Sequence, residues 1–401
     1  MVRMLFLQDL IRIELIDNDG REKIMSSNVE FIYLNEQDMI QAGVKNMEKC
    51  IDSIEDMFVL LHKGDYRMGG ENANEHGIRV SFPKTTTIKG MPTHKPDFRF
   101  MAMPAYLGGR FKMFGIKSYG SNPDNAQKGL PRSILMMQLM DATTGAPLAY
   151  MSANILSAMR TGATTGVGVR HLTAKNPKTI AIIGPGTMSR YTMSAFISEQ
   201  PTIDTLRIKG RSQRGIDSFV AYCKENFPNI KEYIVCDDLA DVCQNADIVF
   251  YGTTNAANYE DNPTVKKEWL KKGALVIAAS ALLVDTEFLA DKDVKLISDN
   301  YAMYDGWGSG QPLPTQKNVS TLLGMGFYDA VTEGRISRDS ITEIGEILLG
   351  EKSGRDSDEQ IILYAVGGMP IEDVAWGYDV YQNALKNGIG TKLKVWDTPA
   401  L

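Results

Sequence analysis

The sequence is poor in cysteine and histidine, and neither residue is spaced as a metal or redox site requires. It contains no C-x-x-C pair, which argues against a structural zinc site and a redox dithiol. It contains no H-E-x-x-H pair either, and the histidines are scattered. The residues concerned are Cys50, Cys223, Cys236, Cys243, His62, His76, His94 and His171. A G-x-S-x-G hydrolase elbow is also missing, so we expect no metal site and no hydrolase of that type.

Long apolar runs and an excess of positive charge are missing too. No run approaches the ~18 residues of a membrane span, and residues 1–9 lack the apolar core of a signal peptide. The 43 Lys and Arg are outnumbered by 49 Asp and Glu, for a formal net charge of -6. No basic face is therefore expected to concentrate phosphate. We expect a cytoplasmic protein whose partners include neither nucleic acid nor a membrane.

The rest of the composition is globular, with 43% hydrophobic and 23% charged residues among 401, which excludes a disordered or fibrous protein. At roughly 100–200 residues per domain, this length predicts two or three domains. Residues 1–30 are typical of an added hairpin, because residues 10–16 alternate in polarity and Asn18-Asp19-Gly20 supplies a turn. Apolar residues at helical spacing over 36–63 predict a helix ending at Lys63-Gly64, and the polar stretch 65–100 predicts loops between short strands.

Short apolar runs alternate with helix-like stretches in the middle of the chain. The runs are Thr179–Ile183, Thr205–Lys209, Tyr233–Val235, Asp247–Tyr251, Ala274–Ala279 and Lys295–Ile297. This alternation is typical of a parallel sheet with helices on both faces. The sequence therefore predicts an α/β protein with a Rossmann-like, doubly wound dinucleotide-binding domain at 151–369. It is inserted into a discontinuous α+β substrate and dimerisation domain, at 1–150 and 370–401, with a helix over Pro370–Leu385 returning across the interface.

A glycine turn, residues 184–189, follows the first of these strands. Ser189 stands where the G-x-G-x-x-G fingerprint has its third glycine, so the motif alone is weak evidence. Its context is stronger, because the turn follows a strand, opens a helix and precedes a second strand. Gly184 allows the tight turn, Gly186 lets the backbone approach a pyrophosphate, and the free N–H groups at the helix start, including Thr187 and Met188, bind that anion. The alternative is a glycine turn in a domain that binds no nucleotide.

The loop after the second strand indicates which nucleotide is preferred. An NAD site usually has Asp or Glu there to bind the ribose hydroxyls, whereas this chain has Lys209-Gly210-Arg211-Ser212-Gln213-Arg214. Arg211, Ser212 and Arg214 suit a 2′-phosphate. We favour NADP(H) as the cofactor, with NAD(H) and a merely solvated basic loop as the alternatives. Thr253 and Thr254, which follow another strand, are candidate contacts on the nicotinamide side.

Motifs on both sides of the turn resemble a known family. They are Met103–Tyr106 leading into Gly115–Tyr119, the small-residue segment Ala158–Thr165, and Gly367–Asp373. In this order they resemble the ornithine cyclodeaminase/mu-crystallin family, over residues 31–397. Two further stretches, 115–125 and 387–391, are similar to the branch that contains N-(2-amino-2-carboxyethyl)-glutamate dehydrogenase, an enzyme of siderophore-precursor synthesis.

The resemblance implies an NAD(P)-dependent enzyme that acts on amino or imino acids as a homodimer formed through the substrate domain. Lys117 matches the family's lysine for the substrate carboxylate, and Arg160 matches an arginine that touches the cofactor and helps to neutralise the substrate. Arg79 matches the family's early carboxylate-binding arginine, with Lys84 as a rival. Ser133 matches a cofactor-contacting hydroxyl. Gly367, in the C-terminal motif, is a candidate substrate contact.

The chemistry of the residues agrees with these roles. An amino or imino acid presents a carboxylate that must be fixed near the nicotinamide, and Arg binds it as a fork whereas Lys binds it as a point charge. The alternatives are a surface lysine at Lys117 and a helix-surface charge at Arg160. Lys117, however, follows Phe114, Gly115 and Ile116, and Arg160 lies among small residues typical of a close-packed interface.

One departure from the family pattern separates the candidate reactions. Cyclodeaminases have an Asp after the sixth strand that handles protons on the substrate amine, and our alignment puts Leu282 there, with Asp285 out of register. Leucine transfers no proton. We therefore favour a dehydrogenase or imine reductase acting on a C–N bond, with Lys117 or a water as the proton carrier. Ornithine cyclodeaminase and a non-enzymatic mu-crystallin-like binding protein remain the alternatives.

Overall fold

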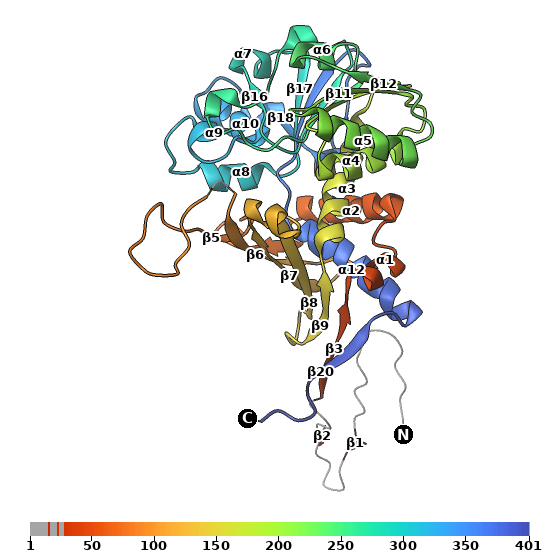
Figure 1. Cartoon of the computed structure of the whole chain (residues 1–401), viewed down its shortest axis with the longest axis vertical. Coiled ribbons are helices and arrows are strands. Elements are labelled where there is room, and N and C mark those ends of the chain that lie inside the picture. The colour runs from red at the N-terminus through yellow and green to blue at the C-terminus, as the bar shows by residue number, and fades with distance from the viewer. Residues whose placement is uncertain (1–14, 17–21, 24–27, 96, 401) are drawn as a thin grey trace.

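The computed structural model describes residues 15–16, 22–23, 28–95 and 97–400. These residues form two large sheets, one parallel and one mixed (Figure 1). The parallel sheet has the strand order β12-β11-β10-β13-β15-β19-β17-β18. Its strands are β10 (Thr179–Ile183), β11 (Thr205–Lys209), β12 (Glu232–Val235), β13 (Ile248–Tyr251), β15 (Leu275–Ala278), β17 (Val294–Ser298), β18 (Ile341–Glu343) and β19 (Ile361–Ala365). The start of this order, with the first strand in the middle and the fourth beside it, is that of a Rossmann fold.

The mixed sheet has the order β20-β3-β9-β8-β7-β6-β4, and β5 also pairs with β6. Its strands are β3 (Val29–Leu34), β4 (Tyr66–Met68), β5 (Ile78–Val80), β6 (Arg99–Leu107), β7 (Met113–Ser121), β8 (Ser133–Asp141), β9 (Pro147–Ser152) and β20 (Thr391–Trp396). Every pairing is antiparallel except that of β3 with β9. Because strands from both ends of the chain make this sheet, the Rossmann-like domain is an insertion, as predicted.

Helices connect and cover the two sheets. They are α1 (Glu36–Gln41), α2 (Met47–His62), α3 (Asn154–Leu172), α4 (Thr187–Glu199), α5 (Gln213–Asn226), α6 (Leu239–Cys243), α7 (Thr286–Leu289), α8 (Tyr301–Gly308), α9 (Thr315–Asn318), α10 (Leu323–Thr332), α11 (Ile344–Leu348) and α12 (Pro370–Asn387). The chain leaves the mixed sheet through α3 and returns through α12, which packs on β6, β7 and β8 (Figure 1). The predicted α/β class with an inserted doubly wound domain is thus confirmed.

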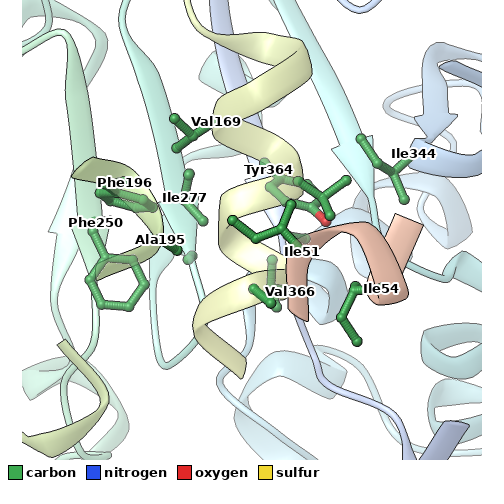
Figure 2. Close-up of a cluster of buried hydrophobic side chains, with 14 of the residues drawn as sticks. Ile51, Ile54, Val169, Ala195, Phe196, Phe250, Ile277, Ile344, Tyr364 and Val366 are labelled. Carbon is green, nitrogen blue, oxygen red and sulfur yellow. The ribbon is translucent and has the colours of Figure 1, made fainter. Parts of the chain in front are cut away.

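Helix α3 is the centre of the core because small residues let its neighbours approach closely. A Cβ at Gly166 would lie 2.8 Å from the Ile51 side chain of α2, and one at Gly168 would lie 2.6 Å from the Tyr364 ring of β19. Figure 2 shows both side chains around this helix, together with apolar side chains from α4 and from neighbouring strands. One continuous core therefore joins the two halves of the molecule.

The structure differs from the sequence-based expectations in a few places. The stretch 36–63 is two helices, because Gly43 has φ +88 in the intervening turn and Asn46 caps the second helix. Strands β18 and β19 complete the parallel sheet and were not in the predicted series. In the predicted N-terminal hairpin, β1 (Leu15–Ile16) pairs with β2 (Glu22–Lys23), and the rest of that segment lies outside the described residues. In the described part of the chain, no helix combines the length and apolarity needed to cross a membrane.

Candidate active site between the two domains

The glycine turn between β10 and α4 has the geometry of a dinucleotide-binding turn. Gly184 has φ +89, and a Cβ there would lie 2.8 Å from the carbonyl oxygen of Gly252. A Cβ at Gly186 would point into open space, so a ligand can approach the backbone there. Ser189 is buried and donates a hydrogen bond to the Gly184 carbonyl (2.6 Å), which ties the turn to the first turn of α4.

A cleft of about 630 Å³ opens at this turn. Six of the predicted cofactor residues line it, namely Gly184, Gly186, Arg211, Ser212, Thr253 and Thr254. Arg211 donates from Nη2 to Thr254 Oγ1 (3.0 Å) and so connects the loop after β11 with the loop after β13. The other predicted contacts do not line the cleft: Arg160 is buried in α3, Thr187 and Met188 begin α4, Arg214 is exposed in α5, and Ser133 lies at the start of β8.

The cleft fits a dinucleotide in two further respects. Gly186, which precedes α4, makes no side-chain cap, so the first N–H groups of this 13-residue helix are available to an anion. The Thr253 hydroxyl is buried without a hydrogen-bond partner among the described residues, although buried hydroxyls normally have one. A pyrophosphate at the helix and a polar group beside Thr253 would satisfy both.

Lys117 of β7 and Arg160 of α3 meet at the base of α12. Lys117 Nζ donates to Asp373 Oδ2 (2.6 Å) and to Ser157 Oγ (3.1 Å). Arg160 donates from Nε to Asp373 Oδ1 (3.1 Å) and from Nη1 to Glu372 Oε2 (2.7 Å). Lys117 is 2% exposed and Arg160 is 5% exposed. Lys117 is therefore not a surface lysine, and Arg160 is not a charge on the helix surface.

The start of α12 explains why two carboxylates lie here. Pro370 occupies the first turn, where its missing N–H costs nothing, and acidic residues in a first turn interact favourably with the helix dipole. Glu372 also accepts from the Met369 N–H (2.9 Å) and from Thr164 Oγ1 (2.9 Å). The two carboxylates thus compensate two cations that burial would otherwise leave unpaired.

Burial and mutual contact shift the pKa values of this cluster. Burial and the charge of Arg160 lower the pKa of Lys117 to about 8, against the opposing effect of Asp373. Burial disfavours the charged form of Arg160, but Asp373 and Glu372 outweigh it and raise the pKa of the guanidinium. Burial raises the pKa of Glu372, although Arg160 opposes this. The Lys117 ammonium therefore loses its proton at a pH closer to neutral than a surface lysine does.

The turn at Gly367 and Gly368 is attached to the same cluster. Asp299 Oδ2 accepts from the N–H groups of Gly367 (2.6 Å) and Gly368 (3.3 Å). Gly368 has φ +78, and a Cβ there would lie 2.8 Å from Arg160 Nη1, so the guanidinium packs directly on this glycine. Burial raises the pKa of Asp299 to about 6, while the hydrogen bond from the Gly367 N–H opposes the shift.

Arg79 is outside the ion cluster but lies on the same sheet face as Lys117. It pairs with Met101, which pairs with Tyr119, two residues along β7 from Lys117; residues two apart on a strand share a face. Arg79 is exposed, and its side chain makes no ion pair or hydrogen bond with the described residues. Leu282, aligned with the cyclodeaminase acid, is fully buried.

Sequence reasoning missed four residues of this site. Glu372 and Asp373 were named only as part of a motif. The signal that could have found them is that two buried cations require anionic partners. Asp299 follows β17 and carried no signal of its own. His76, passed over as a scattered histidine, has its Nδ1 2.8 Å from the Gly368 carbonyl oxygen. No group of three His, Cys, Asp or Glu side chains suited to a metal ion occurs among the described residues.

Residues 44–388 match the model of the ornithine cyclodeaminase/mu-crystallin family. The chain belongs to this family. It is 27% identical to N-((2S)-2-amino-2-carboxyethyl)-L-glutamate dehydrogenase of Staphylococcus aureus, over 92% of this chain and 100% of that one. It is 32% identical to an alanine dehydrogenase of Archaeoglobus fulgidus, over 75% and 84% of the two chains. An archaeal alanine dehydrogenase dimer with bound NAD superposes with a TM-score of 0.71 at 26% identity, covering 92% of this chain and 100% of that one.

Proposed function

We propose that this family member is an NAD(P)(H)-dependent dehydrogenase or imine reductase that acts on the C–N bond of an amino or imino acid. The observation that carries the proposal is the buried pair of cations, Lys117 of β7 and Arg160 of α3, where the mixed-sheet domain meets the Rossmann-like domain that holds the dinucleotide cleft. Helix α3, which carries Arg160, lies along α4, the helix that follows the cleft-lining Gly186: a Cβ at Gly162 would be 2.7 Å from the Tyr191 carbonyl oxygen.

In the proposed mechanism, Lys117, Arg160 and Arg79 hold the substrate carboxylate. The guanidinium of Arg160 binds it as a fork, and Lys117 adds a point charge. Lys117 and Arg160 already donate to the carboxylate of Asp373. Their N–H groups are thus already oriented toward a carboxylate, and the substrate carboxylate would replace Asp373 or share these donors with it. Gly184, Gly186 and Arg211 would hold a nicotinamide nucleotide, which would supply the hydride chemistry at the substrate's α-carbon. The residues fix the geometry of that carbon before transfer, which lowers the barrier.

NADP(H) is the proposed preference. Arg211 and Ser212 line the cleft where a ribose 2′-phosphate would lie, and Arg214 is exposed at the start of α5, next to the cleft-lining Gly215. The absence of Asp or Glu from residues 209–214 supports this choice. NAD(H) is the alternative, because the archaeal alanine dehydrogenase structure holds NAD.

Two other functions are less well supported. Ornithine cyclodeamination needs an acid for the substrate amine, and the aligned position holds the buried Leu282. A binding protein without activity has no need for a buried ammonium and guanidinium held by two carboxylates, an arrangement that is costly to desolvate.

We further propose a cytoplasmic homodimer, with the domain boundaries expected from the sequence at 150/151 and 369/370. The face of the mixed sheet away from α12 exposes large apolar side chains, and such patches mark interfaces. They are Ile78 (69%), Val80 (55%), Phe100 (47%), Ile134 (48%) and Tyr150 (39%). The four cysteines are buried and unpaired, in keeping with a reducing compartment.

The test is a screen of amino acids against NADP⁺ and NAD⁺, and of keto acids with amines against NADPH and NADH, followed at the reduced-nicotinamide absorbance. We expect net turnover of at least one amino or imino acid. Release of ammonia from ornithine without net nucleotide turnover would contradict the proposal and favour the cyclodeaminase.

A further inference from the structure

His76 lies at the junction of the two domains, beside the ion cluster. Its Nδ1 is 2.8 Å from the carbonyl oxygen of Gly368, at the turn that leads into α12. Its ring meets the edge of Trp307 of α8, with 5.8 Å between centroids. The charges of Lys117, Arg160 and Asp373 are close enough to act on its ionisation. A residue of the mixed-sheet domain thus contacts the Rossmann-like domain and the return helix together.

The hydrogen bond to Gly368 determines the tautomer of the ring. A carbonyl oxygen only accepts, so Nδ1 carries the hydrogen and the Nε2 of a neutral ring has a free lone pair. Burial, together with Lys117 and Arg160, lowers the pKa of His76 to about 4, against the effect of the Gly368 carbonyl and Asp373. The ring is therefore neutral at pH 7. Within the described residues Nε2 has no hydrogen-bond partner, and it is not sealed from solvent.

This lone pair complements the other groups of the site. Lys117 and Arg160 only donate, and the carboxylates of Glu372 and Asp373 are already engaged by them. An amino acid held by its carboxylate brings an N–H group two bonds from the carboxyl carbon. A neutral acceptor beside the two cations is the partner that this N–H group requires.

We propose that His76 Nε2 accepts a hydrogen bond from the substrate's α-nitrogen and takes the proton that this nitrogen releases. The inference deepens the proposed function and rests on it. In the oxidative direction the N–H bond of the substrate ammonium breaks and its proton moves to Nε2, leaving an amine. Hydride then leaves the α-carbon for the oxidised nicotinamide nucleotide, and an iminium forms. In the reductive direction hydride reaches the iminium carbon first, and the imidazolium then returns the proton to the amine nitrogen, which gives the ammonium.

The charges that face His76 make this transfer responsive to the substrate. Lys117 of β7 and Arg160 of α3 depress its basicity, and Asp373 of α12 opposes them; Trp307 of α8 is uncharged. A substrate carboxylate bound to the two cations offsets their charge. Nε2 therefore becomes a better base when the substrate is in place.

The test compares two planar ligands of the same shape, pyrrole-2-carboxylate and furan-2-carboxylate, which differ in the presence of the ring N–H. Their binding to the full-length protein saturated with NADPH is measured by calorimetry. We expect the wild type to bind pyrrole-2-carboxylate about tenfold more tightly, the effect of one buried hydrogen bond. His76→Asn keeps an N–H donor toward Gly368 but has no ring nitrogen to accept, and we expect it to bind both ligands alike.

His62→Asn is the matched control, because His62 is bonded to Glu351 at the surface end of α2, and it should keep the tenfold preference. With a substrate from the screen, His76→Asn should lose about 100-fold in kcat, as expected for a lost acid–base group, with unchanged NADPH affinity. Equal binding of the two ligands to the wild type, or a preference that survives in His76→Asn, overturns the role of His76 but leaves the proposed function standing. Failure of both ligands to bind while NADPH binds overturns the amino-acid site itself, and with it the proposed function.

Discussion

The ammonium of Lys117 and the carboxylate of Asp373 lie 2.6 Å apart, and neither side chain is more than 2% exposed. The carboxylate raises the pKa of the ammonium, which burial and Arg160 otherwise depress. Since only the ammonium binds a carboxylate, we expect affinity for an amino-acid substrate to fall as pH rises through about 8. Removing the negative charge of Asp373 moves this loss to lower pH.

Asp373→Asn tests this relationship. The pH dependence of kcat/KM should show its alkaline limb about one unit lower or more than in the wild type. Asp379→Asn is the control, because Asp379 lies on the same helix and pairs with the partly exposed Arg110. An alkaline limb that stays in place in Asp373→Asn would show that Lys117 does not set it.

Lys117→Met removes the charge while keeping a long apolar stem in a buried position. We expect turnover to fall by about 100-fold or more, because the substrate carboxylate loses its point charge. The dissociation constant of NADPH, measured by fluorescence, should stay within twofold. Lys386→Met, at an exposed site on α12, should leave both quantities unchanged. A Lys117→Met enzyme with near-normal turnover removes this residue from the site.

The double variant Arg211→Ala/Arg214→Ala tests the nucleotide preference. We expect the dissociation constant of NADPH to rise by about 10–100-fold and that of NADH by less than threefold, because charge-assisted bonds to a phosphate are lost only with the former. Arg335→Ala, which removes a surface arginine paired with Glu333, serves as the control. Equal losses for the two nucleotides would contradict a 2′-phosphate site.

His76 should also affect how the free energy of unfolding depends on pH. Its folded-state pKa is about 4, below the usual 6.5, so between these values the unfolded chain binds the additional proton. The stability that it contributes is present above pH 6.5 and is lost as pH falls through 4, by at most about 3 kcal/mol. Chemical denaturation at pH 7, 5.5 and 4 should therefore show a smaller acid loss in His76→Asn than in the wild type. Parallel curves for the two proteins would contradict the depressed pKa.

Phe100→Lys/Ile134→Glu tests the proposed homodimer. These exposed side chains lie on neighbouring positions of β6 and β8, across Gly120 of β7. Charges placed there should convert a dimer into a monomer, as measured by sedimentation velocity. Val235→Glu, at an equally exposed apolar site on β12 of the parallel sheet, should stay dimeric. A wild-type protein that sediments as a monomer would refute the dimer directly.

The fold was largely predictable because its signals are local. The β-branched runs that became β10, β11 and β13 are each flanked by turn residues, and Gly184 and Gly186 define the turn by their missing side chains. The break between α1 and α2 escaped prediction, since an apolar period continues through the turn at Gly43.

The candidate site was only half predictable because its contacts are long-range. Lys117 and Arg160 could be singled out from their local surroundings, but Asp373 is 256 residues away from Lys117 along the chain. His76 comes to Gly368 across 292 residues. Such pairings depend on how β7, α12 and the loop before β5 pack together, which no pattern within a single segment encodes.

The chain passes between its two domains twice, outward through α3 and back through the turn at Gly368, and Arg160 is held to the start of α12 at that crossing. The ion pairs that connect α3 to α12 are thus made by the same guanidinium that would bind the substrate carboxylate. A ligand that binds Arg160 competes with Asp373 and Glu372 for its N–H groups. Ligand binding and the rigidity of the connection between the two domains therefore depend on the same hydrogen bonds.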